Sequence, residues 1–179
     1  MSIKELTQEI HRYAETRPFV RTLFSGKMNP RLYAIYLYNQ FHMYEVLEVC
    51  AMSHGILNDL PEILRCKNIR ADFEELWDSG INPPLCPVVD EYLKHILSIK
   101  DDPKKLLAHI YVRHMGDLYG GQMIAQRVPG SGKYYQFDNP EELKLKIRVK
   151  IDDSMADEAK LCFTYAARFL DEMMQHVEQ

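Results

Sequence analysis

The stretch Arg113-His114-Met115-Gly116-Asp117-Leu118-Tyr119-Gly120-Gly121-Gln122 carries the strongest signal in the chain. It continues a helical pattern that begins at Leu106, yet it contains three glycines. Each glycine inside a helix costs on the order of 1 kcal/mol relative to alanine. Gly116 and Gly120 are four residues apart, so they lie on one helix face and leave it without side chains. The pattern predicts a kinked helix whose backbone can be approached closely from one side.

Two interpretations of this bare face are open. A planar ligand that needs a proton-relay partner would suit it, because Asp117 lies beside the face and Arg113 one turn before. Close packing of a second helix, as in small-xxx-small contacts, would explain the same glycines. The segment by itself does not separate the two.

Composition indicates one globular domain over residues 1–179, with 46% hydrophobic and 27% charged residues. A net charge of −4 and a pI near 6.0 argue against a nucleic-acid-binding protein. No apolar run approaches the roughly 20 residues that span a bilayer, and we expect no signal peptide and no membrane anchor. The cysteines form no CxxC pair, so reduced thiols are expected. We therefore expect a cytoplasmic monomer, or a stromal one if a plastid transit peptide has been removed.

The hydrophobic pattern repeats at helical spacing nearly throughout, and no strand-like alternation competes with it. The predicted fold class is all-α. Prolines and asparagines mark several helix starts, and the Pro-rich segment 80–87 is predicted to be a loop. Helices are predicted over 7–13, 18–26, 30–52, from 59 onward, 72–77, 88–99, 106–125, 140–150 and 153–176.

Among the histidines, His11 stands out because Glu15 follows it by one helical turn. A carboxylate at this position can hold one ring nitrogen and leave the other to coordinate a metal. A lone helical histidine is nevertheless more often an ordinary surface or core residue. The other histidines show no HExxH or paired-ligand spacing, so no structural zinc site is expected.

Several short elements, taken together and in order, resemble the heme oxygenase family over nearly the whole chain. The poorest match is the segment 53–87. The matching elements are Lys4, His11 and Glu15, Tyr111-Val112-Arg113, Gly116-Asp117-Leu118-Tyr119-Gly120-Gly121-Gln122, Tyr134-Tyr135-Gln136-Phe137, and the basic pair Lys144 and Arg148. The resemblance implies an all-helical fold in which heme lies between the first helix and the kinked glycine helix.

The resemblance also implies roles for individual residues. His11, held by Glu15, would be the proximal ligand of the heme iron, and heme b would be both cofactor and substrate, with O2 as co-substrate. On the opposite side Gly116 and Gly120 would bring the backbone close to the heme, and Asp117 would hold the water network that delivers protons. Tyr44 and Arg113 would belong to the same distal network. A clamp for the heme propionates would consist of Lys4, Tyr111, Lys144 and Arg148.

The activity implied is oxidative opening of heme at one meso bridge, the α position, to biliverdin, carbon monoxide and ferrous iron. We expect electrons from a soluble donor, with an acidic ferredoxin preferred, and a downstream bilin reductase as a possible partner. Neither nucleic acid nor a membrane is expected as a partner.

Alternatives to this activity remain open. A heme carrier or sensor on the same fold is one rival, although such a protein has no use for Asp117. A thiaminase-like helical enzyme is another, although no cysteine lies in the setting it needs. Without the resemblance, Lys144 and Arg148 would simply be a solvated helix face, and Cys86-Pro87 is not expected to bind a second heme.

Overall fold

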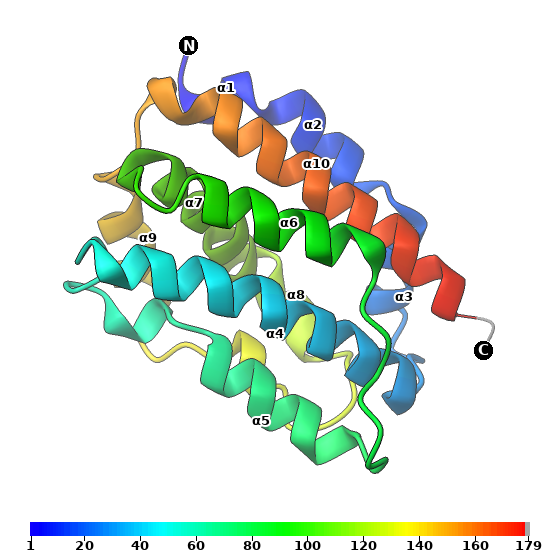
Figure 1. The fold of residues 1–179 in the computed structure, drawn as a ribbon. Helices are drawn as coiled ribbons and strands as arrows, with labels where there is room; N and C mark the ends of the chain where they lie inside the picture. The colour runs from blue at the N-terminus through cyan, green and yellow to red at the C-terminus, as the bar shows by residue number, and fades with distance from the viewer. Residues whose placement is uncertain (178–179) are drawn as a thin grey trace.

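The computed structural model describes residues 1–177, and within this range the chain is helical with no β-strand, which confirms the all-α fold class (Figure 1). No helix in the described range combines the length and the apolar character that crossing a membrane requires. The α-helices are α1 (Ile3–Leu6), α2 (Gln8–Glu15), α3 (Pro18–Phe24), α4 (Pro30–Ser53), α5 (Cys66–Leu76), α6 (Pro87–Ser98), α7 (Pro103–Tyr119), α8 (Gly121–Ala125), α9 (Pro140–Arg148) and α10 (Ala156–Met173). Short 3-10 segments are η1 (Pro61–Ile63), η2 (Lys133–Tyr135), η3 (Asp153–Met155) and η4 (Met174–His176).

Local sequence signals explain where most helices begin. Proline occupies the first turn of α3, α4, α6, α7 and α9, where its missing N–H has no partner to lose. Asn29 caps α4 by accepting the Arg31 N–H at 2.8 Å, and Asp102 caps α7 by accepting the Lys105 N–H at 3.1 Å. The predicted starts at residues 18, 30 and 140 are therefore confirmed.

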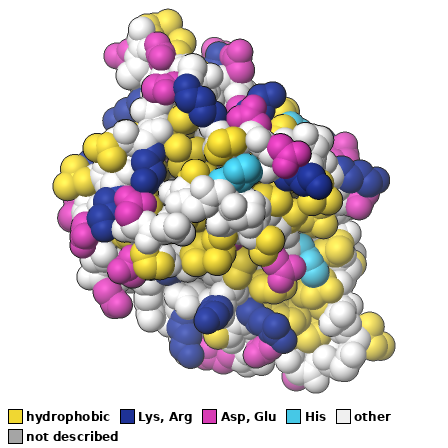
Figure 2. Space-filling model, turned by 60° about the vertical axis from the view of Figure 1, so that its left-hand side comes forward, with side chains coloured by type: hydrophobic (Ala, Val, Ile, Leu, Met, Phe, Trp, Pro, Cys, Tyr) yellow, Lys and Arg dark blue, Asp and Glu magenta, His cyan; other side chains and the backbone are white. Residues whose placement is uncertain are grey.

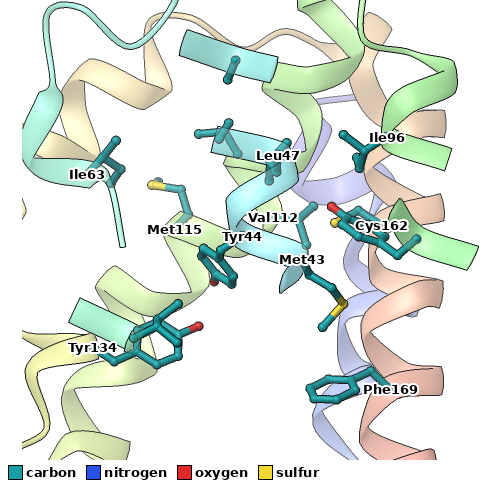
Figure 3. Packing of buried hydrophobic residues seen from close by; sticks show 14 of the residues in the cluster. Met43, Tyr44, Leu47, Ile63, Ile96, Val112, Met115, Tyr134, Cys162 and Phe169 are labelled. Atoms are coloured by element: carbon teal, nitrogen blue, oxygen red, sulfur yellow. The ribbon is translucent and has the colours of Figure 1, made fainter. Parts of the chain in front are cut away.

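The long helix α4 is the centre of the fold. It packs against α5, α6 and α7. On the other side of α6 and α7, α10 packs against these two helices and against α2 (Figure 1). Because α4 is enclosed by neighbours, it buries residues all around its circumference. Figure 3 shows the core where α4, α7 and α10 meet, with side chains that include Met43, Tyr44, Leu47, Val112, Met115, Cys162 and Phe169.

The prediction of a helix that begins at Asp59-Leu60-Pro61 was wrong. Only the short segment η1 forms there. Helix α5 starts at Cys66 and contains the helix predicted over 72–77 except its last residue, Trp77. The start of α5 is capped from another helix, since the Glu48 carboxylate accepts the N–H groups of Arg65 at 2.8 Å and Cys66 at 3.2 Å. A cap supplied by a residue so distant in sequence leaves no local signal.

The helix predicted over 106–125 is divided at Gly120. The Gly120 N–H still bonds to the Gly116 carbonyl at 2.9 Å. The Gly120 carbonyl is shared between the Met123 N–H at 3.1 Å, only three residues on, and the Ile124 N–H at 3.3 Å. Gly121 opens α8 beneath Tyr135, and a Cβ atom there would lie 2.4 Å from the Tyr135 Cδ1 atom. Packing against the Tyr135 ring thus requires glycine at position 121.

At the C-terminal end the helix predicted over 140–150 ends at Arg148, and the one predicted over 153–176 begins and ends in 3-10 turns.

Candidate active site

A buried carboxyl group lies at the centre of the candidate site. Asp117, on α7, is 7% exposed and accepts hydrogen bonds from the hydroxyls of Tyr44 on α4, at 2.6 Å, and Tyr134 on η2, at 3.2 Å. Figure 3 shows these two tyrosines close together in the core. Burial raises the pKa of Asp117 to about 6, although the nearby His114 and the two hydroxyls act in the opposite direction. The carboxyl group can therefore hold or release a proton close to neutral pH.

The hydrogen bonds continue beyond Tyr134 into a buried polar chain. The Gln40 side-chain amide donates to the hydroxyls of Tyr134 at 3.4 Å and Tyr36 at 3.0 Å. The Tyr36 hydroxyl in turn lies 3.3 Å from that of Tyr135. Because each hydroxyl can both donate and accept, this chain fixes the orientation of the group that meets Asp117.

Tyr134 is held in place through its backbone. The Asp72 carboxylate accepts the N–H groups of Lys133 at 3.1 Å and Tyr134 at 2.8 Å. The buried Arg65 guanidinium donates to the carbonyls of Tyr134 and Gln136, both at 2.9 Å. In the sequence Tyr134 stands out only as part of the motif Tyr134-Tyr135-Gln136-Phe137, because nothing in its spacing connects it with Asp117.

Arg113, predicted as a catalytic residue, is directed away from Asp117. Its Nε donates to the Tyr92 hydroxyl at 3.0 Å, and its guanidinium lies over the Tyr92 ring at 4.2 Å. Its connection to Asp117 is indirect, since the Arg113 carbonyl lies 3.4 Å from the hydroxyl of Tyr44, which also bonds Asp117. In this arrangement the Arg113 side chain stabilises the packing behind the site.

The glycine face of α7 is open. A Cβ atom on Gly116 would meet no other atom within 4 Å, and one on Gly120 would meet only the Gly116 carbonyl, at 3.5 Å. Both glycines are exposed, so no second helix covers this face. The large side chains of Tyr119 and Met123 at adjoining helix positions are 48% and 56% exposed. The close helix packing considered from the sequence is therefore not what these two glycines serve.

His11 lies on α2 with its side chain 53% exposed. Its Nε2 is 2.9 Å from Glu15 Oε1, which leaves Nδ1 outside the pair. The ring stacks on Phe163 of α10, with centroids 4.9 Å apart. Since α10 packs against both α2 and α7, one helix supports the imidazole and the glycine helix alike.

The predicted basic residues are only partly brought together. Lys144 and Arg148 on α9 both lie over the Tyr119 ring, at 4.1 and 5.7 Å from its centroid. The Lys144 side chain is 12% exposed and pairs with Glu141 at 2.9 Å, so it does not belong to a freely solvated face.

The other two residues predicted for the propionate clamp are on α1 and α7. Tyr111 is half-buried on α7 beside Thr7, and Lys4 is exposed on α1. Within the described residues no ion pair or hydrogen bond links Lys4 to the pair on α9.

These features fit a large planar ring that carries a metal and carboxylates. His11 offers a nitrogen ligand, and the bare face beside Tyr119 and Met123 offers an apolar surface. Lys144 and Arg148 offer cations for carboxylates. Figure 2 shows one side of the molecule on which hydrophobic side chains gather centrally and charged ones lie mostly around them.

Comparison with known proteins agrees with the resemblance seen in the sequence. The heme oxygenase family matches residues 1–171. The heme oxygenase of Guillardia theta is 31% identical over 89% of this chain and 70% of its own length. Heme oxygenase 2 of Macaca fascicularis is 28% identical over 97% of this chain and 64% of its own length. The chain thus spans about two thirds of the length of these curated relatives.

Solved structures of heme oxygenases share the fold of this chain. The heme oxygenase of Leptospira interrogans superposes with a TM-score of 0.82 at 26% identity, covering 96% of this chain and 100% of that one. Heme oxygenase-1 of the cyanobacterium Synechocystis, solved in complex with heme, gives 0.85 at 24% identity, covering 98% and 92%. The second likeness bears on the fold alone.

Proposed function

The chain belongs to the heme oxygenase family, and on that premise we propose that it opens heme oxidatively to biliverdin, with release of carbon monoxide and ferrous iron. The observation that carries this proposal is the open glycine face next to a buried carboxyl whose pKa is about 6. A ring placed on that face would lie against bare backbone with a proton donor at its edge.

Heme binding would rely on groups of different kinds on the two sides. His11 would provide the iron ligand, with the ring plane set by Phe163 and the basicity of the imidazole increased by Glu15. Lys144 and Arg148 would bind the propionates, and Lys4 and Tyr111 would extend that clamp. Exposed charge pairs are worth only about 0–1 kcal/mol each, so they orient the ring more than they hold it.

The proton supply would come from Asp117. A general acid works best when its pKa is near the working pH, and the burial of Asp117 brings its pKa to about 6. The hydroxyls of Tyr44 and Tyr134 fix both carboxyl oxygens, so the direction of proton delivery is set before oxygen arrives. The oxidising chemistry is that of heme with O2 and external electrons.

A heme carrier or sensor on the same fold is the second candidate. The structure favours catalysis over it, because burying a carboxyl costs free energy that simple binding does not require. Asp117 is buried beside an exposed surface and is held by two hydroxyls, an arrangement that serves proton transfer.

We also propose cleavage at the α-meso carbon and a soluble electron donor, with an acidic ferredoxin preferred. The donor proposal is supported by Arg148, which is exposed on α9, because the neighbouring Lys144, Lys146 and Lys150 pair with Glu141, Glu142 and Asp59. An exposed cation attracts an acidic partner at long range and at low salt.

The direct test is to load the protein with heme under anaerobic conditions and then admit O2 with a reductant. We expect a sharp Soret band on loading, followed by its loss and the appearance of biliverdin and carbon monoxide. A stable complex that never converts to biliverdin would establish the carrier instead. Chromatography of the product identifies the bridge that was cut, and ferredoxin in place of a chemical reductant tests the donor.

A further inference from the structure

A cluster of metal-ligating side chains lies away from the glycine face, where α6, α7 and α10 meet. His95 Nε2 and His109 Nε2 lie 2.5 and 2.8 Å from the same oxygen of Glu158. The three candidate ligand atoms all lie within 4.8 Å of one another. No spacing in the sequence indicated this cluster, because each residue comes from a different helix.

The donor set is that of a divalent transition metal. Two imidazoles and one carboxylate bind Zn²⁺ or Fe²⁺ with further positions open to water. Ligand bonds of about 2.0–2.2 Å would require these nitrogen–oxygen distances to open by less than about 1 Å. The side chains of His95 and Glu158 are 17% and 13% exposed, whereas His109 is fully buried, so the open positions would face solvent.

The surroundings of His109 already provide the second contact that a metal-bound imidazole needs. Its Nδ1 lies 2.7 Å from the Tyr92 hydroxyl, whose oxygen also accepts from Arg113 Nε. A metal on Nε2 requires the proton on Nδ1, and the Tyr92 oxygen can accept it. The Tyr92 hydroxyl also separates His109 from the buried cation Arg113.

We propose that His95, His109 and Glu158 form a second metal site, which takes a divalent first-row transition cation, Zn²⁺ or Fe²⁺. Binding would replace the two hydrogen bonds to Glu158. A neutral imidazole would then carry its proton on Nδ1, and an imidazolium would release its Nε2 proton to solvent. The proposal depends on the geometry of this cluster and is independent of heme cleavage.

Titration of the heme-free chain with Co²⁺ tests it, because Co²⁺ bound to nitrogen and oxygen ligands gives visible ligand-field bands. We expect saturable bands that Zn²⁺ and, under anaerobic conditions, Fe²⁺ displace and that Mg²⁺ does not. The relative competition of Zn²⁺ and Fe²⁺ tells which of the two the site prefers. Glu158→Gln and His95→Gln should each weaken Co²⁺ binding at least about tenfold.

His11→Ala is the matched control, since it removes a His–carboxylate pair outside the cluster and should leave the bands unchanged. Bands that survive in both cluster variants, or that vanish in His11→Ala, would overturn the proposal. Thermal unfolding gives a second readout, because Zn²⁺ should raise the midpoint of the native chain and not that of folded Glu158→Gln. Absence of both the bands and the midpoint shift in the native chain would also overturn it.

Discussion

The two sides of the proposed heme site are built in different ways. On α2, His11 and Glu15 are half-exposed or more, one turn apart, and supported by the single ring of Phe163. On α7, Asp117 is buried and held by hydroxyls from Tyr44 and Tyr134.

This difference predicts for which side a small molecule can substitute for the missing protein group. An exposed ligand on a short helix can be removed with little effect on the fold, and a small molecule can take its place. A carboxyl group on α7 that is fixed by hydroxyls from two other elements, α4 and η2, has no such substitute. We therefore expect variants of the two sides to fail differently.

The largest effect is expected from Asp117→Ala. Heme should still bind, since His11 and the apolar face are unchanged, but the rate of biliverdin formation should fall on the order of 100-fold or more. Single-turnover assays with heme, O2 and reductant measure this rate. We also expect increased oxidation of a peroxidase dye by the variant. Biliverdin formed at the native rate would remove Asp117 from the mechanism.

His11→Ala should abolish normal iron ligation and leave the fold intact. Its side chain is 53% exposed, so alanine removes little packing, and changes at such positions usually stay within about 0.5 kcal/mol. Heme absorption spectra report the ligation, and far-UV circular dichroism reports the fold. An unchanged histidine-ligated spectrum would mean that another residue is the ligand.

Asp117→Asn should stabilise the heme-free protein in a pH-dependent way. The pKa of Asp117 is raised from 3.8 to about 6, so the folded state keeps the proton after the unfolded chain has lost it. The native protein therefore loses stability as the pH rises from about 4 to 6, by up to the order of 3 kcal/mol, whereas the asparagine variant does not. Denaturant unfolding at pH 4 and pH 8 measures the difference. A gap that is the same at both pH values would show that Asp117 titrates normally.

The two kinds of glycine on the distal side should respond with opposite signs. Gly121→Ala places a Cβ atom 2.4 Å from the Tyr135 ring, so it should destabilise the heme-free protein by about 1–3 kcal/mol. Gly116→Ala meets no atom within 4 Å and should stabilise it by roughly 0.5–1 kcal/mol, while weakening heme binding. Thermal unfolding and heme titration of the pair check this. Equal destabilisation by both would mean that the glycine face is not open.

The smallest effect on binding is expected from reversing the charges of Lys144 and Arg148 together. Arg148 is exposed, where a charge pair contributes only about 0–1 kcal/mol, and Lys144 is already paired with Glu141, so heme affinity should change little. Because about 1.4 kcal/mol shifts a population tenfold, the in-plane orientation of the heme should nevertheless relax. Chromatography should then resolve a mixture of biliverdin isomers. A single unchanged isomer would assign regiospecificity to contact with the glycine helix.

Most of the helices and the exposed side of the site could be predicted because their signals are local. A helix start marked by proline, the one-turn spacing of His11 and Glu15, and glycines four residues apart all lie within a few positions of one another. The glycine pattern also predicts a kink within the helix over 106–125, although the structure divides this helix in two at Gly120.

The parts of the fold and of the candidate site that could not be predicted depend on contacts between segments that are distant in the sequence. Tyr134 reaches Asp117 only because Asp72 and Arg65 fix its backbone, and α5 starts late because Glu48 caps it from α4. Likewise, the orientation of Arg113 toward Tyr92 depends on the packing of α6 against α4 and α10. No short-range pattern carries this information.

The most direct test of the account is single-turnover biliverdin formation with added imidazole, in His11→Ala and Asp117→Ala side by side. Imidazole should restore a large part of the activity of His11→Ala, because the distal side is intact and the missing ligand lies on an exposed helix. It should restore none to Asp117→Ala. Restored ligation without biliverdin in His11→Ala, or equal rescue of both variants, would contradict the division between a replaceable side and a fixed one.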